Sequence, residues 1–299
     1  MASRIIDGTT RKSWSDRLLS ARFLLRRTLS KLSYAPVPVH LKVDENEVLD
    51  FWWSYIVPYF EPTRGFFDYW GHDSSELRFL WHALKPGMVF FDIGAYHGIY
   101  SLVAARRLGD SGQVVAFEPS PREFARLRLH LQWNGLRSAC AECCAVGSAS
   151  EERTFFQVSS GDTTRNSLRP PATSDSLNEV RVKTVLLDQY IAAFPLDRVD
   201  MVKLDVEGGE LDALRGGSTL LSRFRPIFIC EVLDAATQPW GYEAREIVST
   251  FLRHDYVWFD FQPGGALSPH KIKERYPEVK NFLAVPSEKL PAVAEKIAS

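Results

Sequence analysis

The most chemically capable side chains of this sequence are three acids that follow apolar runs in its second half. Asp205 ends one apolar run, Glu207 follows it two residues later, and Glu231 ends the next apolar run. Clustered carboxylates can hold a ligand's ammonium group, bind a divalent metal or take a proton from a substrate hydroxyl. An acid that merely complements a helix N-terminus is the alternative, and it suits Glu210 better. We therefore predict Asp205, Glu207 and Glu231 as catalytic residues, with Asp205 and Glu231 at neighbouring strand ends facing one pocket and Glu207 in the turn after the first of these strands.

A glycine-rich turn follows an earlier apolar run, within residues 89–101. Asp92 ends that run, Gly94 and Gly98 follow it, and an amphipathic segment begins immediately afterwards. The pattern predicts a buried strand whose C-terminal end enters a turn that opens a helix. In an open α/β sheet, a nucleotide-like cofactor binds at this junction. The glycines let backbone N–H groups approach such a ligand, and the helix N-terminus adds partial positive charge.

The spacing of this turn narrows the choice of cofactor. The dinucleotide fingerprint requires a glycine at position 96, where this sequence has Tyr96. Glu118 ends the next apolar run, about one βα unit later, and a carboxylate there can accept hydrogen bonds from both ribose hydroxyls of a nucleoside. An ordinary strand–turn–helix corner and a solvated strand-end acid are the alternatives. His97, inside the turn, is either a local acid or base or a side chain that satisfies backbone groups.

Composition limits the partners. The chain has 299 residues, with 36 Lys and Arg against 37 Asp and Glu, so its formal net charge is -1. A chain with so little net charge lacks the broadly basic surface that attracts nucleic acid. We therefore expect no nucleic-acid partner. The four cysteines do not form a disulfide framework, which fits a reducing compartment and a cytoplasmic location.

The N-terminal segment is the basic part of the chain. Residues 1–33 combine arginines and lysines with leucines at helical spacing, which predicts a basic amphipathic leader. Such a segment can make a peripheral membrane contact through residues 11–32, dock a partner, or pack on the body of the protein. A transit peptide has a similar composition. No apolar run approaches the roughly 20 residues of a membrane span.

From residue 88 onward, short apolar runs alternate with helical stretches, which predicts an α/β fold with a mostly parallel, doubly wound sheet. A final pair of strands, at 256–261 and 281–285, is expected to be antiparallel. The region before this domain is rich in aromatic residues and could cap the sheet or pack as an auxiliary core. We expect these parts: leader 1–33, cap region 34–85, main domain 86–286 with a strand and loop insertion at 150–185, and tail 287–299.

Several of these segments resemble the FkbM-type methyltransferase family. The resemblance covers about residues 85–286, and the segment at 202–210 is its most specific part. It implies a Rossmann-like class I methyltransferase fold, S-adenosylmethionine as donor, and a hydroxyl acceptor on a sugar, glycolipid or natural-product-like small molecule. The matching residues are Asp92-Ile-Gly-Ala, Gly98, Glu118, Asn134-Gly135 and Val202-Lys-Leu-Asp-Val-Glu-Gly-Gly-Glu.

The resemblance also implies roles for individual residues. Asp92, Gly94 and Gly98 would surround the methionine part of the cofactor and Glu118 its ribose. Asp205 and Glu207 would face the transferring methyl group. Asp205 or Glu231 is the first candidate for the base, followed by His97 or Glu207. The family usually has Asn or His where Tyr96 stands here. The implied cofactor-binding set is Asp92, Gly94, Ala95, Gly98, Glu118 and Asn134.

Two alternatives remain open at this point. Residues 200–205 are similar to the metal-binding strand of catechol O-methyltransferase-like enzymes, which would make the transfer metal-dependent. In those enzymes an acid and an amide end the next strand, whereas Val232 follows Glu231 here, so we assign no metal ligand. The other alternative is a non-catalytic cofactor-binding module that docks a membrane or a partner. Acceptor specificity is expected in residues 40–85 and in the loop at 159–178.

Overall fold

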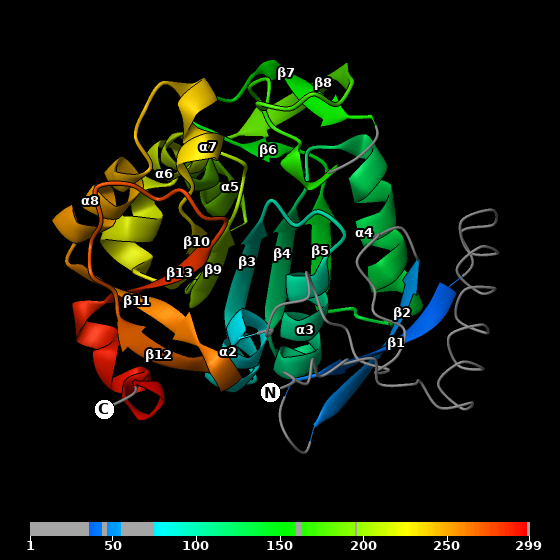
Figure 1. Ribbon diagram of the computed structural model, residues 1–299. Coiled ribbons are helices and arrows are strands. Elements are labelled where there is room, and N and C mark those ends of the chain that lie inside the picture. The colour runs from blue at the N-terminus through cyan, green and yellow to red at the C-terminus, as the bar shows by residue number, and fades with distance from the viewer. Residues whose placement is uncertain (1–35, 44–46, 55–74, 160–162, 195, 298–299) are drawn as a thin grey trace, which may run out of the picture. The chain divides into compact units, whose positions relative to one another are not determined.

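The computed structural model describes residues 36–43, 47–54, 75–159, 163–194 and 196–297 (Figure 1). The chain divides into two compact units, Met1–His72 and Asp73–Ser299. The expected basic leader, with its membrane contact, lies outside the described residues. The larger unit begins at Asp73, ahead of the boundary at 86 expected from sequence, so it includes the first helix described below.

The described part of the smaller unit is a β-hairpin. Strand β1 (Pro36–Lys42) pairs antiparallel with β2 (Val48–Ser54), with Val39 opposite Phe51. Phe51 and Trp53 are buried whereas Trp52 between them is exposed. This alternation follows the two-residue period of a strand, whose successive side chains point to opposite faces.

The larger unit is built on an eight-stranded sheet in the order β12-β11-β13-β10-β9-β3-β4-β5. Strands β10, β9, β3, β4 and β5 are mutually parallel, and β13 runs antiparallel to both β10 and β11. The predicted Rossmann-like α/β class and the C-terminal antiparallel pair are therefore confirmed, and β12 is an edge strand that the sequence did not predict. The bounds are β3 Val89–Ile93, β4 Gln113–Phe117, β5 Ala139–Glu142, β9 Met201–Leu204, β10 Ile227–Glu231, β11 Tyr256–Gln262, β12 Ala266–Pro269 and β13 Asn281–Pro286.

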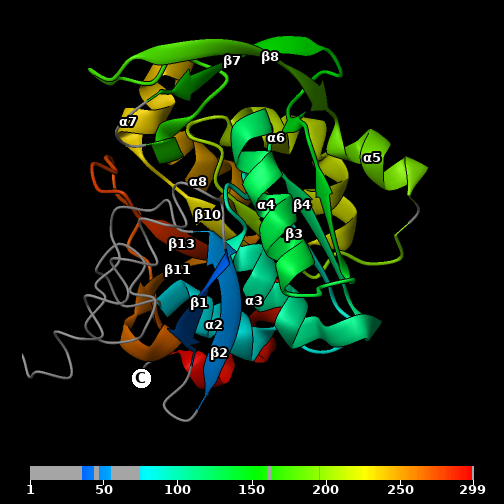
Figure 2. The same cartoon turned by 90° about the vertical axis from the view of Figure 1, so that its right-hand side faces the viewer.

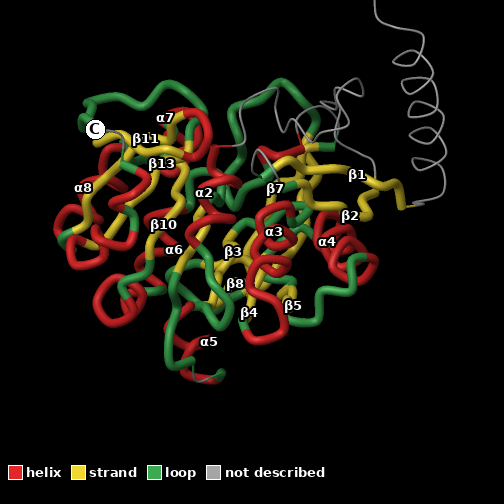
Figure 3. The backbone as a smooth tube through the Cα atoms, turned by 90° about the horizontal axis from the view of Figure 1, so that it is seen from below, coloured by secondary structure: helices red, strands yellow, loops and turns green. Residues whose placement is uncertain are grey.

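Helices cover both faces of this sheet, and Figure 3 shows α2 and α5 on opposite sides of the strands. Every residue of β3 and β10 is buried, as a parallel sheet covered on both faces requires. On one face, side chains of α5, α6 and α8 join a single hydrophobic core with the strands. The helices are α2 Ser75–Ala83, α3 Ile99–Leu108, α4 Pro121–Trp133, α5 Leu187–Ala193, α6 Glu210–Gly216, α7 Asp234–Thr237 and α8 Arg245–Arg253.

A second, three-stranded sheet lies between α4 and α5 in the chain and near the carboxyl ends of the main strands (Figures 1 and 2). Its order is β6-β8-β7, with β6 at Ala145–Val146, β7 at Glu152–Val158 and β8 at Leu177–Val185. The connection from β7 to β8 runs close to the site described next. None of the described helices is both long and apolar enough to cross a membrane.

Candidate active site

The carboxyl ends of four neighbouring parallel strands meet at one edge of the sheet, where open α/β folds bind their ligands. At or just after the ends of β3, β4, β9 and β10 stand, in turn, Asp92, Glu118, Asp205 and Glu231. Because the strands are adjacent in the sheet, acids far apart in the sequence come to the same edge.

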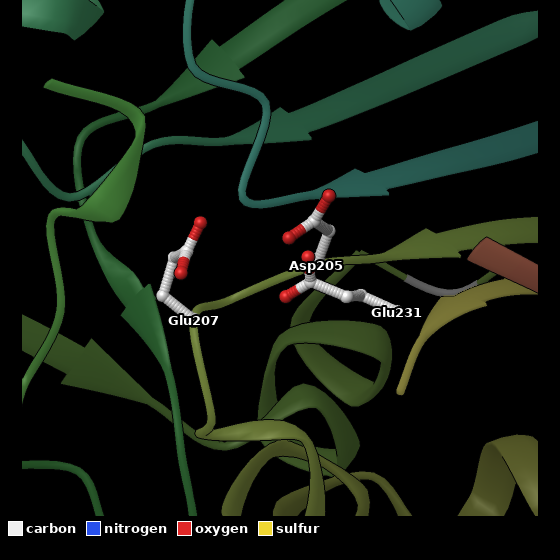
Figure 4. A group of neighbouring side chains, drawn as sticks. All are labelled: Asp205, Glu207 and Glu231. Atoms are coloured by element: carbon white, nitrogen blue, oxygen red, sulfur yellow. The ribbon is translucent and has the colours of Figure 1, made fainter. Parts of the chain in front are cut away.

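Three acids at this edge form a compact group, which we call the acid cluster: Asp205, Glu207 and Glu231. One carboxylate oxygen from each lies within 4.8 Å of the other two (Figure 4). Glu207 stands in the turn between β9 and α6 with a left-handed backbone, φ 54, and Gly208 follows it with φ 92. The structure therefore brings Glu207 together with Asp205 and Glu231, the two acids expected to face one pocket. The catalytic role of all three remains a prediction.

Glu231 is the most enclosed member of the acid cluster. Its residue is 5% exposed, and its Oε2 atom is buried with no hydrogen-bond partner among the described residues. Burial, reinforced by the charges of Asp205 and Glu207, raises the pKa of Glu231 well above its usual value. A buried carboxylate oxygen without a partner is unfavourable, and it marks a place where a ligand or a proton can bind.

Lys203 contributes a buried positive charge that was not predicted from the sequence. Its residue is 2% exposed, and its ammonium group donates to Asp205 Oδ2 at 2.6 Å and to Asn281 Oδ1 at 3.0 Å. Burial disfavours the charged ammonium, but the carboxylates of Asp205, Glu231 and Asp92 outweigh it and raise the pKa of Lys203. The sequence did contain a signal for this pairing, a lysine inside an otherwise apolar strand. A buried charge requires a partner, so a nearby acid could have been expected.

The turn between β3 and α3 packs directly against the backbone of Asp205, the first member of the acid cluster. Gly94 has φ +85, and a Cβ atom on it would lie 1.7 Å from the backbone oxygen of Asp205. Gly98 has φ +87, and a Cβ there would lie 2.4 Å from a Leu127 methyl group. Gly94 is thus required by the neighbouring backbone, whereas Gly98 is required by its positive φ, since the Leu127 side chain could shift. Neither reason is the close ligand approach expected from sequence. The Ala95 N–H donates to the backbone oxygen of Phe117 at 2.9 Å.

Asp92 and Glu118 are both buried beneath this turn. Asp92 accepts a hydrogen bond from the Ser101 hydroxyl at 2.5 Å, and burial raises its pKa to about 6. The Glu118 carboxylate accepts the backbone N–H groups of Tyr96 at 2.7 Å and Ser120 at 2.8 Å. Burial raises the pKa of Glu118 to about 8. Glu118 therefore anchors the turn, and its predicted contact with a ribose would use its remaining acceptor capacity.

His97 makes hydrogen bonds that lead away from the acid cluster. Its Nε2 lies 2.7 Å from Glu123 in the first turn of α4, and its backbone oxygen accepts from His130 Nδ1 at 2.7 Å. Burial lowers the pKa of His97. The structure thus joins His97 to α4 and does not bring it together with the three acids.

Asn134 requires a correction. It ends α4 as its C-cap residue, and its side-chain amide donates to the backbone oxygen of His130 at 2.7 Å. Helix α4 begins at the carboxyl edge of the sheet beside Ser120 and runs for 13 residues, about 20 Å, toward the other edge. Asn134 therefore caps a helix at the far edge, and we remove it from the cofactor-binding set.

The fold and the site together define a class: a doubly wound α/β protein with a glycine-rich turn and a cluster of acids at the carboxyl edge of its sheet. The family model described as the methyltransferase FkbM domain matches residues 92–258, which is more than half of the chain. The chain belongs to this family, as the resemblance in its sequence implied.

Curated relatives agree with this assignment. Methyltransferase 1 of Beauveria bassiana is 28% identical over 42% of this chain and 56% of its own length. The 2-O-methyltransferase NoeI of Sinorhizobium fredii is 30% identical over 48% of this chain and 63% of its own length. The hexuronic acid methyltransferase AglP of Haloferax volcanii is 26% identical over 56% of this chain and 64% of its own length. The chain thus spans less than two thirds of each of these relatives.

Among solved structures, the chain is similar to the methyltransferase FkbM from Methylobacillus flagellatus. The two share 15% sequence identity with a TM-score of 0.42, over 67% of this chain and 44% of that one.

Proposed function

We propose that this protein is an S-adenosylmethionine-dependent O-methyltransferase that acts on a hydroxyl group of a sugar, a glycolipid or a natural-product-like small molecule. The observation that carries the proposal is the close packing of the two turns. Gly94 of the predicted cofactor turn meets the backbone of Asp205, so a cofactor held at that turn would lie next to the acid cluster.

The residues at this edge suit such a cofactor. The sulfonium group of S-adenosylmethionine supplies an activated methyl group, and transfer to oxygen is an in-line displacement in which positioning provides most of the acceleration. The turn at Gly94 fixes the place of the methionine part, and Glu118 offers a carboxylate for the ribose. The unpartnered Oε2 of Glu231 offers a further acceptor toward the pocket.

The acid cluster could accept the proton that the acceptor hydroxyl loses during methyl transfer. An alcohol is a weak nucleophile, so a base within hydrogen-bond reach must take its proton as the new bond forms. One oxygen of Asp205 is held by Lys203 at 2.6 Å, which fixes the carboxylate and leaves its other oxygen for the acceptor hydroxyl. We therefore place Asp205 first as base, with Glu231 second.

The names of the relatives support a hydroxyl-bearing acceptor. One relative is named a 2-O-methyltransferase and another a hexuronic acid methyltransferase, so O-methylation and a sugar acid each appear in the names of similar proteins. In this chain, the connection from β7 to β8 reaches the same turns, since Ser167 donates to the backbone oxygen of Glu207 at 2.8 Å. This connection is our candidate for the segment that selects the acceptor.

Transfer of a labelled methyl group from S-adenosylmethionine tests the proposal. The purified chain is incubated with a panel of glycosides, lipid extracts and small polyhydroxylated natural products. We expect a labelled, base-stable ether product that disappears when Asp205 is replaced by Asn. Binding of S-adenosylhomocysteine without transfer to any member of the panel would instead favour a non-catalytic cofactor-binding module.

A further inference from the structure

The acid cluster brings three carboxylates close together beside one buried lysine. Asp205, Glu207 and Glu231 supply three carboxylates, and Lys203 supplies one ammonium group, paired with Asp205 at 2.6 Å. Carboxylates gathered this closely repel one another when they are ionised. Buried charges of one sign are costly unless a counter-charge joins them.

A second observation indicates that a ligand binds at this spot. Glu231 is 95% buried, which follows from its 5% exposure, and its Oε2 has no hydrogen-bond partner among the described residues. Figure 4 shows the carboxylate of Glu231 directed toward that of Asp205, with the carboxylate of Glu207 across from both. A cation bound at this spot would contact the unpartnered oxygen of Glu231 and reduce the repulsion among the three carboxylates.

The spacing of the cluster matches a single metal ion. The three oxygens lie within 4.8 Å of one another. Oxygens that share a divalent cation at about 2.0–2.5 Å are at most about 4–5 Å apart. Hard divalent cations prefer such carboxylate ligands and commonly keep several waters or substrate oxygens in their remaining positions.

We propose that Asp205, Glu207 and Glu231 form a binding site for one divalent cation, such as Mg²⁺ or Mn²⁺. The sequence argued against a metal because Val232 follows Glu231, but the third oxygen comes from Glu207 in the turn after β9. The left-handed backbone of Glu207, φ 54, places its side chain beside those of the two strand-end acids. The open positions of the cation would hold the acceptor hydroxyl. This last role rests on the proposed function, whereas cation binding does not.

Isothermal titration of the metal-free full chain with Mn²⁺ or Mg²⁺ alone tests this site, with no cofactor or acceptor present. We expect about one Mn²⁺ per chain, with affinity reduced at least tenfold in Glu231→Gln and in Glu207→Gln. Glu207 is only partly buried, so its substitution tests the site even where Glu231→Gln alters folding. Thermal unfolding of each variant checks that the fold is retained.

Glu142→Gln is the matched control. Glu142 also ends a strand at the same edge of the sheet, β5, but it does not belong to the acid cluster. Its substitution is expected to change Mn²⁺ affinity by less than about twofold. Absence of Mn²⁺ and Mg²⁺ binding at millimolar concentration would overturn the proposal. So would binding that survives both cluster substitutions, or that Glu142→Gln weakens equally. Because the titration involves no methyl transfer, its failure is separate from failure of the proposed function.

Discussion

Two turns at the carboxyl edge of the sheet are built alike and differ in the acids that lie beside them. In each, a buried strand leads to a non-glycine residue with a left-handed backbone, Tyr96 at φ 50 and Glu207 at φ 54. In each, a glycine with positive φ follows, Gly98 or Gly208, just before or near the start of a helix. Left-handed backbones cost a non-glycine residue about 1–2 kcal/mol, so both turns hold strained conformations.

The difference lies in the acids beside the turns. Glu118, next to the first turn, accepts two backbone N–H groups, from Tyr96 and Ser120. Glu231, next to the second turn, keeps an oxygen without a partner among the described residues and shares its surroundings with two more carboxylates. Both turns are held by internal hydrogen bonds, since Glu210 accepts the N–H groups of Val206 and Gly208 in the second turn. Only the second turn also has the acid cluster beside it. This contrast suits a division between holding a cofactor and carrying out chemistry.

Gly94→Ala is the substitution that should damage the first turn most. The added Cβ would lie 1.7 Å from the Asp205 backbone oxygen, so one of the two turns must move. We expect loss of detectable S-adenosylhomocysteine binding by calorimetry, at least about 100-fold. Gly87→Ala is the control, because Gly87 has nearly the same φ, +83, and a Cβ atom added to it would meet nothing within 4 Å. Backbone strain is thereby matched, about 1 kcal/mol in each variant. Unchanged S-adenosylhomocysteine affinity in a folded Gly94→Ala variant would contradict the assignment of this turn to the cofactor.

Asp205→Asn should affect the second turn without disturbing the first. The amide oxygen of Asn can still accept from Lys203, so the fold should persist, but the group that takes the acceptor proton is gone. We expect turnover to fall by about 10²–10⁴-fold. S-adenosylhomocysteine affinity should stay within about threefold. Asp212→Asn, at an acid on α6 that pairs with Arg153, serves as the control. A methylation rate unchanged in Asp205→Asn would refute the base assignment.

The acids at the carboxyl edge of the sheet could be predicted from sequence because each one is placed there by its own strand. Each apolar run that ends in an acid predicts a buried strand, and parallel strands must end at a common edge. Asp205 and Glu231 could therefore be brought together without knowing any long-range contact. Glu207 followed from its position in the turn after the strand.

The parts that the sequence could not predict depend on long-range packing or on distance along an element. The second partner of Lys203 is Asn281, 78 residues away, and no spacing rule connects the two. Asn134 was assigned by motif resemblance, yet the length of α4 carries it to the far edge of the sheet. His97 lies in the turn between β3 and α3, as predicted from sequence, but only the structure shows that its ring pairs with Glu123.

The pH dependence of cofactor binding tests the predicted role of Glu118, the acid beside the first turn. Burial raises the pKa of Glu118 to about 8, so below that pH the ligand-free protein holds a proton there. Ribose hydroxyls donate hydrogen bonds that favour the carboxylate, so binding should release this proton. Affinity for S-adenosylhomocysteine should therefore rise as pH increases from about 7 to 9, by about tenfold at most, and level off above the pKa. Glu118→Gln should remove this slope while the titration of the ligand's own amine remains. An identical slope in both proteins would contradict the ribose role.

Tyr96→Phe should give the smallest effect, because it removes only the Tyr96 hydroxyl and leaves the backbone of the first turn in place. The Tyr96 hydroxyl lies 2.6 Å from the Thr163 hydroxyl, which joins the cofactor turn to the connection between β7 and β8. Loss of a partly buried bond of this kind costs about 1 kcal/mol. If the connection selects the acceptor, the acceptor KM should rise about two- to fivefold while S-adenosylhomocysteine affinity is unchanged. Thr163→Val should produce the same change, and the double variant should add nothing further, since both substitutions break one bond. Equal losses in cofactor affinity would instead show that this bond supports the first turn itself, and that the two turns are less separate in function than the acids beside them indicate.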